Sequence, residues 1–182
     1  MEEFSTPSGA VVKNYRANDS LAVTHDLDCI PLSSVQSRFT PPDLYNAFAK
    51  CIKQGSYEDA MGLFMLAGGY VRFDIQRVAD RTAHQARTVL LIKYGSDLAP
   101  SEKNGWNAYA DEFSSNSTKR ERVCETIKKI GAPSYYPMYM IQHGINAFSK
   151  DKAEPLVKDF DEKKVWEKVL EENLLCKVNS HR

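Results

Sequence analysis

The chain of 182 residues has no long apolar run, no net charge and no closely spaced cysteine pair. Its longest apolar run, 61–67, is far shorter than the roughly 20 residues of a helix that crosses a bilayer, so we expect no membrane span. Lys plus Arg and Asp plus Glu each total 24, which leaves no excess charge to attract nucleic acid or an anionic membrane. A nucleic-acid partner is therefore not expected.

The four cysteines lack the CxxC spacing of a zinc or redox site; they are Cys29, Cys51, Cys124 and Cys176. Four cysteines allow three different pairings, and a protein in an oxidising compartment can form two disulfides from them. In the cytosol the same side chains would be small core hydrophobes. Residues 1–19 form a polar tail without the apolar stretch of a signal peptide, so an exported protein would have lost its signal.

Apolar residues at helical spacing predict an all-α fold, a single domain over residues 41–182 with an extended N-terminal arm over residues 1–40 and no strand. Asp74, Ser101 and Thr118 are expected N-caps, the last with Glu121 in a capping box, and Gly131 is an expected stop. The pattern predicts about six or seven helices. They are expected at 42–54, 57–67, 74–94, 101–113 and 118–131, within the apolar segment 135–148, and from Asp161 onward.

One helix pair carries a resemblance to a known family. Residues 53–60, Lys-Gln-Gly-Ser-Tyr-Glu-Asp-Ala, resemble the turn of a tetratricopeptide repeat, and Phe64 and Ala67 stand at its later signature positions. No second copy follows at the family period of about 34 residues, so residues 42–68 form a single such pair packed against other helices. Because tetratricopeptide-like domains are mostly binding modules, the resemblance implies protein binding and supplies no catalytic residue.

Patterns that could carry chemistry are weak. Asp80 and His84 are four residues apart on the polar face of the expected third helix, where a solvated surface is the more ordinary interpretation than a general base. The segment 25–28 offers His25 and two aspartates without the spacing of a zinc or calcium motif, and His143 lies in an apolar segment. We therefore expect no catalytic, cofactor-binding or metal-binding residue, and not an enzyme; a hydrolase using Asp80 and His84 is the second alternative.

Two aromatic clusters are the candidate partner-binding residues. The expected loop 68–74 contains Tyr70, Arg72 and Phe73, residue types that are enriched at interface hot spots, although its aromatics could also fold into the core. The segment 135–148 adds Tyr135, Tyr136 and Tyr139, for which core packing is again the alternative. These six residues are the predicted contacts with a protein partner.

A small helical domain with paired cysteines and no active site is similar in type to the periplasmic immunity proteins of type VI secretion effectors. The similarity implies an inhibitor that occludes the active site of a bacterial antagonistic toxin, its cognate partner, in the periplasm. The alternative is a cytoplasmic adaptor or chaperone that binds a peptide in the groove of the tetratricopeptide-like pair. Homodimerisation is left open.

Overall fold

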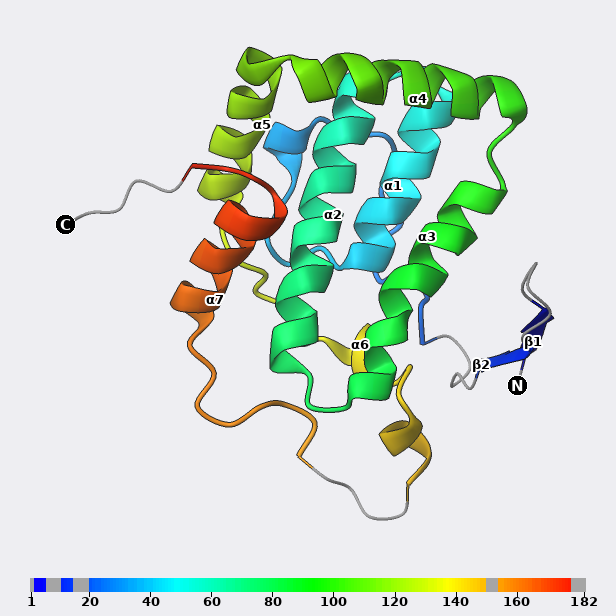
Figure 1. Ribbon diagram of the computed structural model, residues 1–182, viewed down its shortest axis with the longest axis vertical. Helices are drawn as coiled ribbons and strands as arrows, with labels where there is room; N and C mark the ends of the chain where they lie inside the picture. The colour runs from blue at the N-terminus through cyan, green and yellow to red at the C-terminus, as the bar shows by residue number, and fades with distance from the viewer. Residues whose placement is uncertain (1, 6–10, 15–19, 150–153, 178–182) are drawn as a thin grey trace.

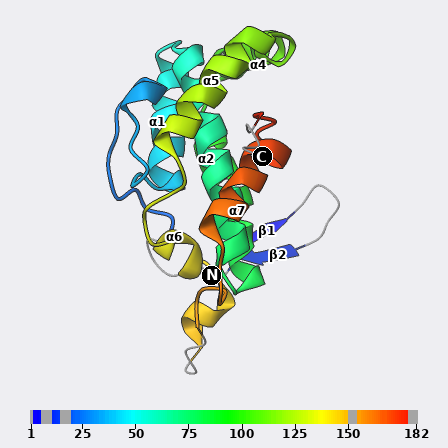
Figure 2. The same cartoon turned by 90° about the vertical axis from the view of Figure 1, so that its left-hand side faces the viewer.

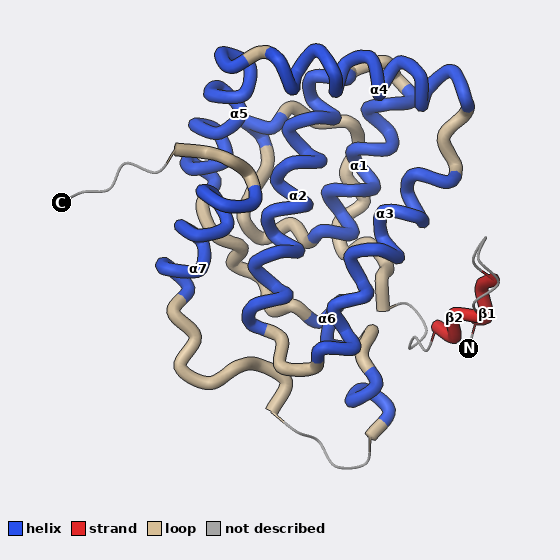
Figure 3. Tube along the Cα trace, viewed as in Figure 1, coloured by secondary structure: helices blue, strands red, loops and turns tan. Residues whose placement is uncertain are grey.

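The computed structural model describes residues 2–5, 11–14, 20–149 and 154–177. Over these residues the fold is all-α, with seven α-helices (Figures 1 and 3). They are α1 (Pro41–Lys53), α2 (Tyr57–Arg77), α3 (Ala86–Ser96), α4 (Pro100–Ser115), α5 (Ser117–Ile130), α6 (Met138–Ile141) and α7 (Glu162–Lys168). Short 3-10 turns η1 (Leu32–Ser34), η2 (Arg81–Gln85) and η3 (Ile145–Phe148), and a π turn η4 (Val169–Asn173), complete the helical elements.

Helices α1 and α2 form an antiparallel hairpin at the centre of the molecule (Figure 1). Gly55 permits the tight turn between them, because its φ of 75° lies in the left-handed region. Helix α3 packs against α1, α4 crosses one end of the pair, and α7 with η4 packs against α2. Seen from the side, α7 lies over α2 (Figure 2), and α5 contacts α4 and η1. The pair expected from the sequence is therefore present, and it forms the core.

Helix α2 continues well beyond its expected end near residue 67. The predicted loop at 68–74 is wrong, because helix runs through Gly68 and Gly69 to Arg77. A Cβ on Gly69 would lie 3.0 Å from a methyl carbon of Leu174, so the glycine gives the C-terminal segment room to pack. Tertiary packing thus outweighs the low helix propensity of the two glycines. Asp74 is consequently a buried residue inside α2 and not the N-cap of a third helix.

The other helix limits follow the sequence more closely. Helix α4 begins after Ala99 rather than Ser101, and α5 is capped by Asn116, whose side chain accepts a hydrogen bond from the backbone N–H of Lys119. The predicted stop at Gly131 is confirmed by its φ of 84°. Asp161 caps α7 as expected. The segment 135–148 is not one central helix; it contains only α6 and η3, joined by turns.

The N-terminal forty residues differ from the predicted arm. Two short antiparallel strands, β1 (Glu2–Ser5) and β2 (Val11–Asn14), pair with Glu2 opposite Asn14, so the expectation of no strand is wrong. Residues 20–40 lie on the helices, and four of their side chains belong to the buried core. Those side chains are Leu21, Leu32, Val35 and Phe39. The sequence did not predict this burial, because the apolar residues of an irregular segment follow neither a helix nor a strand periodicity.

A buried carboxylate and a disulfide hold this segment on α1. Asp43, with none of its surface exposed, accepts backbone hydrogen bonds from Thr24 (2.6 Å), His25 (2.9 Å) and Thr40 (2.9 Å). Burial alone would raise the pKa of Asp43, but these hydrogen bonds outweigh it and hold the pKa below its ordinary value. The Cys29–Cys51 disulfide joins the segment to α1 with a Cα–Cα distance of 4.7 Å.

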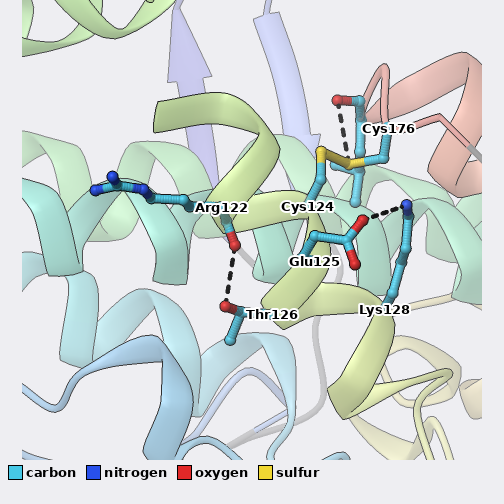
Figure 4. The surroundings of a disulfide bond; sticks show 7 residues. Arg122, Cys124, Glu125, Thr126, Lys128 and Cys176 are labelled. Atoms are coloured by element: carbon cyan, nitrogen blue, oxygen red, sulfur yellow. Dashed lines mark hydrogen bonds and ion pairs between the residues drawn. A yellow bond between two sulfur atoms is a disulfide. The ribbon is translucent and has the colours of Figure 1, made fainter. Parts of the chain in front are cut away.

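The second disulfide fixes the C-terminal end of the described chain. Cys124 of α5 and Cys176 are joined with a Cα–Cα distance of 5.4 Å, beside a Glu125–Lys128 ion pair of 2.8 Å on the surface of α5 (Figure 4). All four cysteines are thus paired, which is typical of oxidising compartments. In the described part of the chain, no helix combines the length and apolar character that crossing a membrane requires.

Candidate functional site

A groove lined mainly by apolar side chains opens where α2 ends. It has a volume of about 420 Å³ and lies between the last residues of α2, the segment around α6 and η3, and the chain at Pro155. We call it the α6 groove. Its apolar lining comes chiefly from Val78, Tyr136, Met138, Ile141 and Pro155, and its polar lining from Asp80, Gln142, Asn146 and Ser149.

Large hydrophobic side chains stand exposed in the same segments. Tyr136 and Met138, which line the groove, are 52% and 46% exposed, and Ile145 and Phe148 of η3 are 56% and 55% exposed. Val157, two residues beyond Pro155, is 44% exposed. Single exposed apolar residues are ordinary, but a group of them on the segments that form one groove is typical of a binding surface. Five of the eight large hydrophobics that are exposed among the described residues belong to this group.

A buried ion pair fixes the start of this surface to α2. Asp74 accepts from Arg77 Nε at 2.7 Å and from the hydroxyls of Tyr135 and Tyr139 at 2.8 and 2.7 Å. Arg77 Nη2 also donates to the backbone carbonyl of Tyr135 at 3.0 Å. Three of these four hydrogen bonds join α2 to Tyr135 or Tyr139, so the chain is attached on both sides of Tyr136, which is itself 52% exposed.

This network perturbs the titration of its members. Burial raises the pKa of Asp74, and the opposing effects of Arg77 and the tyrosine hydroxyls do not cancel it. Burial and then the charge of Asp74 raise the pKa of Tyr135 and Tyr139 well above the ordinary value of a tyrosine. Both tyrosines therefore remain neutral donors at physiological pH, which keeps the backbone of α6 in place.

A second set of hydrogen bonds holds η3. Asp80 accepts from the backbone N–H of Asn146 at 2.9 Å, and Thr82 Oγ1 accepts from the backbone N–H of Ile145 at 2.9 Å. Thr82 in turn donates its own backbone N–H and hydroxyl to Asp80 at 2.9 and 2.6 Å. Gly144 is needed here, because a Cβ at this position would collide with the Asp80 carboxylate. The turn that exposes Ile145 is thus fixed by residues far away in the sequence.

The chain at Pro155, which forms the remaining side of the groove, is held by a short antiparallel bridge between Val78 and Leu156. The backbone N–H of Ala79 donates to Pro155 at 2.9 Å, and that of Val157 donates to Arg77 at 2.8 Å. The bridge places Pro155 beside the end of α2. Three sequence-distant segments therefore meet at the α6 groove, and each is held by identified hydrogen bonds.

The predicted partner-binding residues divide into buried and exposed ones. Tyr70 and Phe73 have no exposed surface and Tyr139 is 5% exposed, so their assignment as partner contacts is wrong; they are core residues of α2 and α6. Tyr135 is partly buried and bonded to Asp74. The structure leaves Arg72 and Tyr136 exposed, and only Tyr136 lies at the groove.

Sequence reasoning missed Ile145, Phe148 and Val157, although an apolar residue beside turn formers, as in Gly144-Ile145, is a usable signal. The sequence pattern suggests a role for Asp80 only as a partner of His84. In the structure Asp80 caps η2, and His84 Nε2 lies 3.0 Å from the carbonyl oxygen of Val78, so the expected Asp–His pair on a regular helix face does not form.

The remaining chemical candidates have structural contacts. His25 Nδ1 lies 3.2 Å from Asp43, and the neighbouring Asp26 pairs with Lys50 at 2.8 Å. No group of three or more potential metal ligands occurs among the described residues. His143 is 4% exposed, within the segment that follows α6.

No family model, curated protein or solved structure matches this chain. The tetratricopeptide-like character of residues 42–68 and the similarity to immunity proteins therefore stay predictions from the sequence.

Proposed function

We propose that this chain is a non-enzymatic inhibitor that binds another protein through the α6 groove. The observation that carries the proposal is the group of exposed large side chains on the segments that form the groove, which are held by hydrogen bonds to α2 and η2. Holding a binding surface in its bound shape reduces the entropy lost on association. The side chains also suit recognition, because Tyr and Met are enriched at protein interfaces.

The narrower form of the proposal is a periplasmic immunity protein that occludes the active site of a bacterial antagonistic toxin. Two disulfides support an oxidising compartment such as the periplasm. In this mechanism Phe148 and Met138 would enter the toxin's cleft and exclude its substrate. Inhibition by occlusion requires shape and apolar contact, and no chemistry from the inhibitor.

The alternative is an adaptor that binds a peptide between α1 and α2. The packing favours the α6 groove over this alternative, because Phe48 and Phe64 fill the space beside the pair with Trp106 of α4. The ring centroids of Phe48 and Trp106 are 5.1 Å apart, so α4 already covers this end of the pair.

The test is co-expression with the protein encoded directly upstream, both directed to the periplasm, with growth as the readout. Wild type is expected to restore growth, and Met138→Asp and Phe148→Asp to lose most protection, since central interface residues contribute about 2–4 kcal/mol each. The matched control is Ile92→Asp, which changes a 62% exposed residue on α3.

The purified pair would then be measured by calorimetry. Formation of a one-to-one complex that Ile92→Asp retains and Met138→Asp weakens supports binding through the groove, because Met138 lines it. If Met138→Asp and Phe148→Asp both protect as well as wild type, or if the wild type neither protects nor binds, the proposal is wrong.

A further inference from the structure

We propose that Tyr45, Arg72 and Arg87 form a binding site for a phosphate group, on the face where α1 lies between α2 and α3. Figure 1 shows this order of the three helices, and α1 packs against both of the others. None of the three residues lines the α6 groove, so the proposal does not depend on the proposed function. A tyrosine hydroxyl and an arginine nitrogen without partners among the described residues carry it, together with a glycine that leaves the hydroxyl uncovered.

The hydroxyl belongs to Tyr45 of α1, which is only 1% exposed. It forms no hydrogen bond with any described residue, although a buried tyrosine hydroxyl ordinarily has a partner. Burial raises the pKa of Tyr45 to about 12, so the hydroxyl keeps its proton at neutral pH. It is therefore a neutral donor that can serve an acceptor from a ligand.

Two arginines supply positive charge near this hydroxyl. The charges of Arg87 and then Arg72 oppose the effect of burial on the pKa of Tyr45, and an interaction of this kind falls off with distance. Within the described ranges, the buried Nε of Arg87 has no hydrogen-bond partner, and neither arginine forms an ion pair. Two uncompensated like charges repel each other, so an anion in contact with both would be stabilised.

Gly68 leaves the hydroxyl without a covering side chain. A Cβ at this half-buried position would lie 3.9 Å from the hydroxyl oxygen of Tyr45, which is an ordinary contact. Packing therefore does not require a glycine here, in contrast to Gly69, although glycine weakens a helix. A larger side chain at position 68 would extend over the hydroxyl. Because Arg72 follows one turn later on the same face of α2, the helix places a cation beside the uncovered donor.

These donors suit a phosphate group better than a carboxylate. Guanidinium groups present planar pairs of N–H donors that match oxyanions, and arginine is charged at physiological pH. A phosphate monoester has a charge of about −1.5 to −2 near pH 7 and three acceptor oxygens, which matches two cations and one hydroxyl. A carboxylate has a single charge and would leave one cation uncompensated. The ligand is therefore a phosphate group, and its source is either free inorganic phosphate or a small phosphate monoester.

The experiment titrates the full chain, with both disulfides intact, with inorganic phosphate and with phenyl phosphate at constant ionic strength. Two-dimensional NMR follows the Nε–H signals of the arginines. The signals of Arg72 and Arg87 are expected to shift together with a dissociation constant of about 1 mM or below. The signal of Arg122, an exposed arginine of α5, should not shift saturably. The probe that binds more tightly identifies the source of the phosphate group.

Variants separate this site from the general charge of the surface. Arg87→Gln should weaken phosphate binding about tenfold or more because it removes a charged donor, and Tyr45→Phe about threefold because it removes a neutral one. The matched control Arg122→Gln should leave the affinity within about twofold, because the charge of a distant exposed residue is screened. Gly68→Leu retains all three polar groups and favours the helix, so it should keep or raise the thermal midpoint while abolishing binding.

The inference is overturned if neither probe binds saturably at concentrations up to about 10 mM. It is also overturned if Arg122→Gln weakens binding as much as Arg87→Gln does, or if Gly68→Leu binds phosphate as tightly as wild type. The NMR titration of the wild type requires no substituted chain to fold. None of these outcomes affects the growth test of the proposed function, whose variants lie in α6 and η3.

Discussion

Replacing Arg77 with methionine is expected to destabilise the fold by about 3–5 kcal/mol, because it leaves the buried carboxylate of Asp74 without its cation. Asp74 has no exposed surface and Arg77 is only 6% exposed, so water cannot replace the lost partner. The guanidinium carbon of Arg77 also lies 5.1 Å from the centre of the Phe73 ring, and methionine loses this cation–π contact as well. The loss is therefore mainly electrostatic. It would be measured by urea unfolding at pH 7, followed by circular dichroism.

The dependence on pH provides a sharper test. The pKa of Asp74 is already raised in the folded protein, and removing Arg77 removes the main effect that lowers it. A carboxyl with a raised folded pKa stabilises the fold below its unfolded pKa of about 3.9, and that contribution is lost as the pH rises through the folded pKa. The deficit of Arg77→Met relative to wild type should therefore be smallest in acid and grow toward neutrality.

A double variant separates charge from packing. Asp74→Asn with Arg77→Met removes both charges and leaves an amide oxygen to accept from the hydroxyls of Tyr135 and Tyr139, so it should be more stable at pH 7 than Arg77→Met alone. A double variant as unstable as the single one, or an Arg77→Met deficit below about 1 kcal/mol, would refute the electrostatic reasoning.

Two other predictions concern the attachments of the chain ends. Replacing both Cys124 and Cys176 with alanine should cost about 4 kcal/mol and replacing both Cys29 and Cys51 about 3 kcal/mol, since the closed loops span 52 and 22 residues; equal midpoints in urea for wild type and either variant would contradict this. Asp43→Asn should lose stability above about pH 4, where the lowered pKa of Asp43 makes the wild-type carboxylate stabilising, and approach wild type as the pH falls through that folded pKa. Thermal unfolding at several pH values checks the second prediction, and a deficit that does not shrink in acid would contradict it.

The sequence by itself determined the helical class and most helix limits, because these depend on local signals. The apolar spacing around Leu44 and Phe48, the turn at Gly55, the stop at Gly131 and the cap at Asp161 each act within a few residues. Such local signals can be recognised from the sequence alone. The four cysteines restricted the pairings to three alternatives, and neighbouring residues could not choose among them.

The tertiary structure decided the continuity of α2 and the position of the surface. Gly68 and Gly69 favour a loop locally, but packing against Leu174, far away in the sequence, keeps them helical. Because α2 is continuous, Tyr70 and Phe73 are buried in the core and are not available to contact a partner. The α6 groove could not be predicted, because its walls meet only through long-range hydrogen bonds, such as that from Asn146 to Asp80 across 66 positions. Which apolar residues are core and which are surface depends on what covers them, and spacing along the chain does not contain that information.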